Sequence, residues 1–175
     1  VSLSSDGQTV AIGATGNDGN GSFSGHVRVY GYDGSAWNQR GADIDGEDAG
    51  DQSGYSVSLS SDGQTVAIGA TGNDANGSFS GHVRVYGYDG STWEQLGADI
   101  NGQSASHNSG VSVSLSSDGQ TVAIGAPYNS GNGLSSGHVR VYGYDGSTWT
   151  QRGADINGQS AGHESGDSVS LSSDG

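Results

Sequence analysis

The sequence predicts an all-β protein built from tandem four-stranded antiparallel blades, and three observations support this prediction. A segment of 56 residues repeats without insertion or deletion, in copies that begin at Val1, Val57 and Val113. Within each copy, apolar and polar residues alternate as they do in strands. Glycine supplies 34 of the 175 residues and proline only one, so glycine and Asx residues make the turns. A fixed period of this length is typical of proteins in which each repeat is one supersecondary unit.

Three complete copies and the start of a fourth organise the chain. The copies cover residues 1–56, 57–112 and 113–168, and residues 169–175 begin the fourth. The first two copies are identical at 45 of 56 positions. Because the chain begins and ends inside the repeated motif, we expect it to be a window of a longer array.

Each copy contains four strand candidates. In the second copy they are residues 56–60, 64–70, 82–88 and about 91–100. A Ser-Asp-Gly turn at 61–63 separates the first two, and a loop rich in glycine and asparagine at 72–81 precedes the third. Asp89 and Gly90 predict a type I′ hairpin between the third and the fourth, since this pair tolerates the positive φ angles that the turn requires.

Four short strands in one repeat meet the needs of a β-propeller blade, and no segment predicts a helix. Closed propellers take roughly four to eight blades. Further blades would therefore come from the rest of the chain or from other copies of it. They would form either part of a larger ring of about seven blades or an open repeat stack that continues as a filament.

Intrinsic disorder is the alternative to this fold, because hydrophobic residues make up only 30% of the chain and the charge is one-sided. The alternation of apolar residues favours an ordered protein. Val10, Ile12 and Ala14 fall on one face of their segment, and Val27 and Val29 fall on one face of theirs.

Charge and residue types exclude several classes of function. Five arginines and no lysine face 19 Asp and Glu residues, which gives a net charge of −14, and such a surface repels the phosphates of nucleic acids. The chain has no cysteine for disulfides or thiolate metal sites. No apolar run approaches the roughly 18 residues needed to span a bilayer, so we expect no membrane insertion.

One stretch of the third copy carries a family resemblance. Residues 110–127 read G-V-S-V-S-L-S-S-D-G-Q-T-V-A-I-G-A-P, and the segments S-G-H-V-R-V-Y and G-S-T-W-T-Q follow. This combination resembles the bacterial branch of the FG-GAP repeats, the blades of integrin-α-like β-propellers, over essentially the whole chain. The resemblance implies an extracellular or cell-surface protein that acts in adhesion or ligand recognition, often with calcium.

Calcium-binding members of that family carry an Asp-x-Asp-x-Asp-Gly loop between the first two strands. Here the same place holds Ser-Ser-Asp-Gly-Gln-Thr, which offers one carboxylate. Calcium takes six to eight oxygen ligands, so we expect no calcium site in this turn.

A later loop of the first copy offers more oxygen ligands. Five carboxylates fall within nine residues: Asp43, Asp45, Glu47, Asp48 and Asp51. Oxygen ligands at alternate positions suit calcium, so these residues are candidates for a calcium site. The second copy is less acidic here, with Asn101 and Gln103 in place of Asp45 and Glu47. A solvated acidic loop is the alternative interpretation.

The glycine-rich loop is another candidate for cation binding. Asn17, Asp18 and Asn20 recur at 73, 74 and 76, although Asx residues beside glycine are first of all turn formers. Asn20 and Asn76 also begin Asn-Gly-Ser sequons, which predict N-glycosylation of an exposed loop in a secreted protein.

Histidine, arginine and tyrosine recur on one face of the third strand. His26, Arg28 and Tyr30 form this face in the first copy, and His82 and His138 begin the equivalent strands. Because buried polar groups need partners, we expect the histidine and the arginine to pair with an Asp of the adjacent repeat.

Aromatic residues around the hairpin are expected to supply large apolar contacts between repeats. They are Trp37, Trp93 and Trp149, with Tyr32, Tyr88 and Tyr144. An aromatic platform for glycans is the alternative interpretation.

The sequence contains no G-x-S-x-G elbow, no H-E-x-x-H pair and no phosphate loop with lysine. Nearly identical copies also favour structural or multivalent roles over a single active site. We therefore predict a non-catalytic structural or adhesive protein outside the cell, forming filaments or surface layers with further copies of the same repeat. The alternative is a module that binds a glycan or protein ligand through the variable loop at 47–55.

Overall fold

The computed structural model describes residues 1–175 and consists of strands and turns. The first blade contains β1 (Ser2–Leu3), β2 (Thr9–Ala14), β3 (His26–Tyr32), β4 (Trp37–Gln39) and β5 (Ile44–Asp45). The second contains β6 (Ser53–Leu59), β7 (Thr65–Ala70), β8 (His82–Tyr88), β9 (Trp93–Gln95) and β10 (Ile100–Asn101). The third contains β11 (Ser112–Leu115), β12 (Thr121–Ala126), β13 (His138–Tyr144), β14 (Trp149–Gln151) and β15 (Ile156–Asn157). The fold has no helix with the length and apolarity to cross a membrane.

Each blade is a four-stranded antiparallel sheet whose last strand is interrupted, and the prediction of tandem all-β blades is confirmed. In the second blade β6, β7 and β8 pair in order, and β9 and β10 both pair with β8. Gln95 lies opposite Tyr86 and Ile100 opposite Val83, so four residues, 96–99, face only two residues of β8. This extra length forms a bulge, and the fourth strand predicted at 91–100 is two short pieces.

The hairpin after β8 is not the type I′ turn that the sequence predicted. That turn needs positive φ at both central residues, but only Gly90 has one, at 103°. The Asp89 carboxylate instead accepts the backbone N–H groups of Ser91, at 2.7 Å, and Thr92, at 2.8 Å. These donors, with that of Thr92 the stronger, lower the pKa of Asp89 to about 2. A side chain therefore closes this loop, where the prediction relied on backbone conformation alone.

The apolar core lies between the blades. At the first junction, the first blade contributes Ala11, Val27, Val29 and Ile44. The second blade contributes Leu59, Val66 and Ile68, against which Val57, Tyr86 and Trp93 also pack. Equivalent residues form the second junction. Because successive side chains of a strand point to opposite faces, the second blade places one apolar set on the first blade and another on the third.

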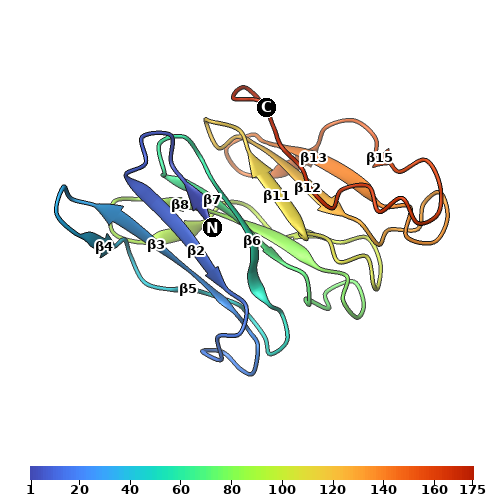
Figure 1. The fold of residues 1–175 in the computed structure, drawn as a ribbon, viewed down its shortest axis with the longest axis horizontal. Helices are drawn as coiled ribbons and strands as arrows, with labels where there is room; N and C mark the ends of the chain where they lie inside the picture. The colour runs from blue at the N-terminus through green and yellow to red at the C-terminus, as the bar shows by residue number, and fades with distance from the viewer.

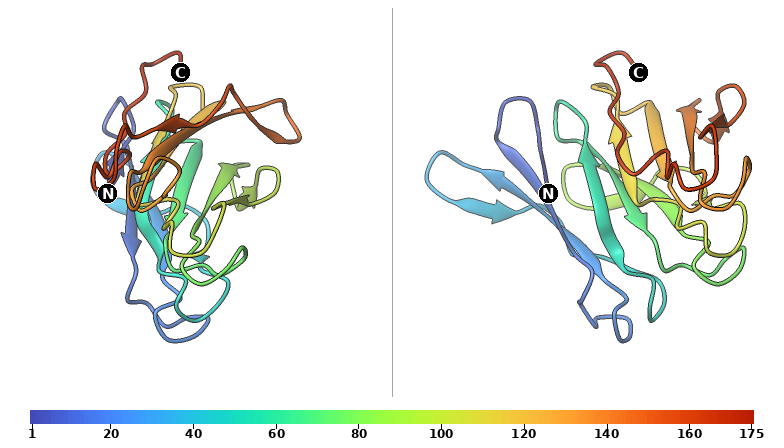
Figure 2. Two further views of the ribbon diagram at one scale, coloured as in Figure 1. Left: turned by 90° about the vertical axis from the view of Figure 1, so that its right-hand side faces the viewer. Right: turned by 45° about the vertical axis from the view of Figure 1, so that its right-hand side comes forward.

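Backbone hydrogen bonds join the turns that follow the first strands of successive blades. The N–H of Ser5 donates to the carbonyl of Ser61, that of Ser61 to Ser117 and that of Ser117 to Ser173, each at 2.9 Å. Donor and acceptor are always 56 residues apart, so this ladder has the period of the sequence. The blades follow one another in chain order across the molecule, and β6 lies between β2 and β11 (Figure 1, Figure 2).

Aromatic side chains connect the hairpins of the second and third blades to the blade before each of them, as the sequence predicted. The Nε1–H of Trp93 donates to the carbonyl oxygen of Arg40 at 2.7 Å, and that of Trp149 donates to Leu96 at 2.8 Å. The Tyr88 ring packs on Trp93 with 5.0 Å between ring centres, and the Arg40 guanidinium lies 4.3 Å from the centre of the Tyr88 ring. Hydrogen bonds and cation–π contact thus supplement apolar packing at the junction.

A glycine in β7 allows the third blade to approach, and replacing it should weaken the second junction. A Cβ on Gly69 would lie 2.1 Å from the carbonyl oxygen of Gly110, just before β11, whereas Gly16 has open space around it. We predict that Gly69→Ala lowers the free energy of unfolding by about 2 kcal/mol or more. Gly16→Ala, the control, should change it by less than about 0.5 kcal/mol. Urea unfolding followed by tryptophan fluorescence measures both values, and a Gly69→Ala protein as stable as the original would contradict this account of the junction.

Candidate functional site

The acidic residues predicted as calcium ligands separate in the fold. Asp43 and Asp45 lie with His26 in the first blade, where one ligand atom from each falls within 4.8 Å of the others. Glu47 extends from the loop between β5 and β6 to the second blade. These three carboxylates therefore do not converge on one ion.

Asp48 and Asp51 lie apart from Asp43 and Asp45, beside Glu47 and the glycine-rich loop of the second blade. Asp51 is 4% exposed, and its two carboxylate oxygens each lie 3.4 Å from Nδ2 of Asn73. The N–H of Asp48 donates to the same carboxylate at 3.3 Å. Together with Glu47 and Asp74 these residues line a pocket of about 390 Å³ between the two loops.

A histidine and an aspartate form a close pair in every blade. The distances from Nδ1 to Oδ2 are 3.4 Å for His26–Asp43, 3.7 Å for His82–Asp99 and 3.6 Å for His138–Asp155. The three histidines are at most 6% exposed, and none of their Nδ1 atoms has a hydrogen-bond partner. The prediction that each histidine pairs with an Asp of the adjacent repeat is wrong. The bulge in the fourth strand places an Asp of the same blade beside the histidine.

Burial favours the neutral form of His82 and His138. Loss of solvent lowers the pKa of His82 below its usual value near 6.5, although Asp99 and Asp51 act in the opposite direction. Loss of solvent lowers the pKa of His138 to about 4, and the charge of Arg140 adds to this shift. A neutral imidazole is the form that ligates metal ions.

In the first two blades, the arginine two positions after the histidine pairs with nearby carboxylates. Nε and Nη2 of Arg28 lie 3.0 Å and 2.8 Å from Oδ2 of Asp43. Arg84 lies between two carboxylates, with Nε 3.0 Å from Oδ1 of Asp99 and Nη2 against Oε1 of Glu47. Glu47 belongs to the preceding blade, so this ion pair crosses the junction. Arg84 therefore pairs with the adjacent repeat as predicted, but with a Glu and not with an Asp.

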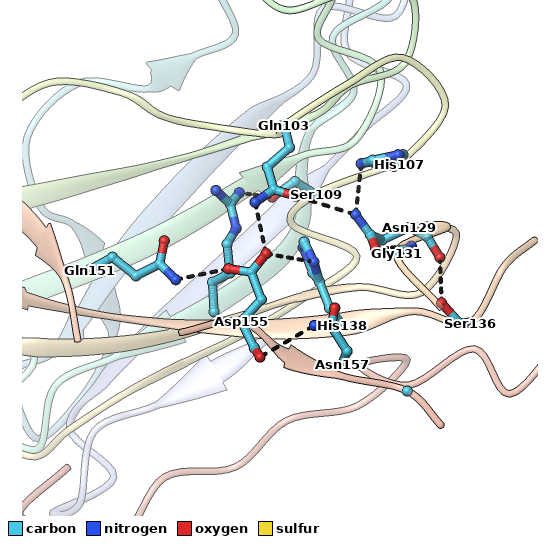
Figure 3. Close-up of polar contacts among 12 residues, drawn as sticks. Gln103, His107, Ser109, Asn129, Gly131, Ser136, His138, Gln151, Asp155 and Asn157 are labelled. Carbon is cyan, nitrogen blue, oxygen red and sulfur yellow. Dashed lines mark hydrogen bonds and ion pairs between the residues drawn. The ribbon is translucent and has the colours of Figure 1, made fainter. Parts of the chain in front are cut away.

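The second junction has an amide where the first has a carboxylate. Gln103 occupies the position of Glu47, and its Nε2 donates to Oδ2 of Asp155 at 2.8 Å (Figure 3). Nε2 of Gln151 donates to the other oxygen of Asp155, also at 2.8 Å. Arg140 does not pair with Asp155, and its Nη2 donates to the carbonyl oxygen of Asn101 at 2.9 Å. The equivalent arginines thus have different partners: carboxylates for Arg84 and a backbone carbonyl oxygen for Arg140.

The turn between the first two strands does not fit calcium. Oδ1 of Asp62 accepts hydrogen bonds from the hydroxyl of Ser60, at 2.6 Å, and from the N–H of Gln64, at 3.0 Å. The single carboxylate of this turn closes it, and no second carboxylate lies in the Ser-Ser-Asp-Gly-Gln-Thr segment to complete an ion site.

Residues of the glycine-rich loop form turns and anchor the loop. Asn17 and Asp18 each accept a backbone N–H of their own loop at 2.8 Å, which favours turn formation over cation binding. The Nδ2 groups of Asn20 and Asn76 donate to a carbonyl oxygen just after the fourth strand, at 2.8 Å and 2.7 Å. Both sequon residues are exposed. Their N-glycosylation stays a prediction, and a glycan would replace one of the two N–H groups on each Nδ2.

Sequence reasoning missed the pairing of histidine with aspartate. The two residues are 17 positions apart in each copy, and the turn between them hides their proximity. A usable signal was the apolar residue at Ile100, one position after Asp99. If Ile100 continues the fourth strand beside β8, it lies opposite Val83 and brings Asp99 near His82.

Comparisons with known proteins support the fold alone. No family model matches the chain, and no curated protein matches its sequence. Among solved structures, the chain is similar to a protein of Bacteroides uniformis ATCC 8492 whose name proposes a 6-phosphogluconolactonase. The TM-score is 0.54 and the sequence identity 15%, over 88% of this chain and 39% of that protein. The chain thus spans well under half the length of the structure it matches.

The low pKa of His138 predicts a loss of stability in mild acid. The unfolded histidine takes up a proton as the pH falls through about 6.5, whereas the folded one does so only near pH 4. Stability that is fully present above pH 6.5 is therefore lost between these values, by roughly 1–3 kcal/mol at about 1.4 kcal/mol per pKa unit. Urea unfolding at pH 7 and pH 4.5 measures this loss.

The control is His163→Gln, which changes an exposed histidine of the same blade. The loss of stability between the two pH values should be smaller in His138→Gln than in His163→Gln. An equal loss in both variants would contradict the role assigned to His138.

Proposed function

We propose that the chain is part of an extracellular, non-catalytic repeat array of the FG-GAP type, with a structural or adhesive role. Each blade joins the next through the same surfaces, and further blades of the same repeat are its partners. The observation that carries this proposal is that the two end faces of the molecule present the same apolar residues as the two sides of its internal junctions.

The face of the first blade that points away from the second is apolar and exposed. Leu3 is 58% exposed and Ile12 is 40% exposed. Their counterparts in the second blade, Leu59 and Ile68, are 7% and 2% exposed because the first blade covers them. Full burial of such a side chain stabilises a structure by about 1.5–3 kcal/mol. A further blade on this face would therefore bind with substantial apolar energy.

The opposite end of the molecule carries the complementary surface. Ile156 of the third blade is 61% exposed, whereas Ile44 and Ile100 at the internal junctions are 6% and 5% exposed. A second copy placed head to tail would bring its Leu3 face onto the Ile156 face, as Leu59 meets the face of Ile44 inside the chain. Its first strand would then displace residues 169–175, because Leu171 and Ser173 occupy the equivalent place beside Ser114 and Ser117 of the third blade. Such a heterologous contact gives a ring when its rotation closes and a filament when it does not.

The loop at 47–55 supports the alternative, a module that recognises a ligand. It lines the 390 Å³ pocket beside the glycine-rich loop of the next blade, and it holds six of the 11 differences between the first two copies. The carboxylates of Glu47, Asp48 and Asp51 give this pocket an acidic character that suits a cationic ligand.

End-to-end association of the chain tests the proposed array. Leu3→Asp places a charge on the exposed end face, and Leu134→Asp makes the same change on a loop of the third blade that is 79% exposed. We expect the original chain and Leu134→Asp to associate as concentration rises, and Leu3→Asp to remain monomeric, because a buried unpaired charge is costly. Sedimentation equilibrium up to about 0.5 mM measures the difference, a range that detects contacts of millimolar affinity or better.

Electron microscopy of the associated chain then separates the two arrays, since rods indicate a filament and discs a ring. A chain that stays monomeric over the whole concentration range, or a Leu3→Asp variant that associates like the original, would contradict the proposal.

A further inference from the structure

The junction between the first two blades contains a group of side chains suited to a metal ion. One ligand atom from each of Glu47, His82 and Asp99 lies within 4.8 Å of the others. Nδ1 of His82 lies 3.7 Å from Oδ2 of Asp99. Ligands held about 2.0–2.2 Å from a tetrahedral ion are about 3.3–3.6 Å apart, so small side-chain shifts bring these donors to ligand spacing.

The histidine of this group supplies a separate indication of a ligand. His82 is 3% exposed, and its Nδ1, which faces Asp99, has no hydrogen-bond partner. Asn101 lies directly opposite His82 in the sheet, and its buried Oδ1 also has no partner. Buried polar atoms without partners are rare and costly in folded proteins. Two of them at the same cross-strand pair, beside two carboxylates, indicate a ligand that binds at least the His82 nitrogen.

We propose that Glu47, His82 and Asp99 bind a divalent transition-metal ion, such as zinc, across the junction of the first and second blades. The imidazole nitrogen favours zinc, copper or nickel over calcium, which takes oxygen ligands. Glu47 comes from the first blade and the other two ligands from the second, so the ion would link the blades. The site lies within one chain and does not depend on the end-to-end association proposed above.

Arg84 occupies part of this site, and the repeat itself provides a second position for it. The guanidinium contacts both Glu47 and Asp99, and its single positive charge leaves one of the two negative charges unbalanced. Arg140, the equivalent residue of the third blade, turns to a backbone carbonyl oxygen of the preceding blade. The same movement of Arg84 would release both carboxylates, whose two charges then match those of a divalent ion.

The second junction serves as a natural comparison. There Gln103 replaces Glu47, and its amide N–H binds the Asp155 oxygen that faces His138. This junction therefore has one carboxylate where the first has two, and an N–H donor where the ion would sit. We expect it to bind zinc far more weakly.

Zinc binding to the chelator-treated chain at pH 7, measured by titration calorimetry, tests the proposal. Glu47→Gln makes the first junction resemble the second and should weaken one zinc equivalent at least tenfold. Glu94→Gln, the control, removes the same charge from an exposed residue of β9, whose carboxylate accepts only the Thr92 hydroxyl, and should leave zinc binding unchanged. Gln103→Glu should add one zinc equivalent at the second junction. This variant tests the proposal independently if Glu47→Gln does not fold.

Absorption spectroscopy of the bound metal completes the test. X-ray absorption of zinc bound to the original chain should show imidazole nitrogen among its ligands, which distinguishes the site from surface carboxylates. This nitrogen signal should fall in Glu47→Gln. Zinc binding that is equal in the original chain and Glu47→Gln, an equal loss in Glu47→Gln and Glu94→Gln, or no added equivalent in Gln103→Glu would each overturn the proposal.

Discussion

Burial of both faces of every sheet is the constraint on which the rest of the structure depends. A blade is one sheet thick, and its apolar residues alternate between two faces. Val66 and Ile68 of the second blade pack on the first, while Ala67 between them packs on the third. A blade without neighbours therefore leaves both apolar sets in water. The repeat solves this problem because each copy presents the surface that the previous copy needs.

The constant core leaves the polar periphery of each junction free to vary. The strands that bury apolar residues are the same in all copies, whereas the loop after the fourth strand differs. At the first junction this loop contributes Glu47 and the buried Asp51; at the second it contributes Gln103 and His107. The packing and the histidine–aspartate pair are repeated, but the second carboxylate, Glu47, is replaced by the neutral Gln103. Chemical differences between junctions arise here without change to the fold.

The alternation of apolar and polar residues within each strand was sufficient to predict most of the fold. The third strand at 82–88 was predicted with its observed bounds, because its apolar pattern is regular and glycine-rich loops precede it. The interrupted fourth strand could not be predicted, since the bulge at 96–99 depends on pairing with β8. The turn at Asp89 was misassigned because a side-chain carboxylate, and not backbone preference, closes the loop. The five carboxylates were grouped by their spacing in sequence, but the bulge and the junction separate them in space.

A single repeat tests the central claim most directly. Residues 57–112 made as an isolated peptide should be unfolded at neutral pH, with the narrow amide proton dispersion of a disordered chain in its NMR spectrum, because neither apolar face has a neighbour. The 175-residue chain should show the wide dispersion of a folded β-protein and unfold cooperatively under the same conditions. An isolated repeat that is folded and monomeric would contradict the claim that contacts between blades hold the fold together.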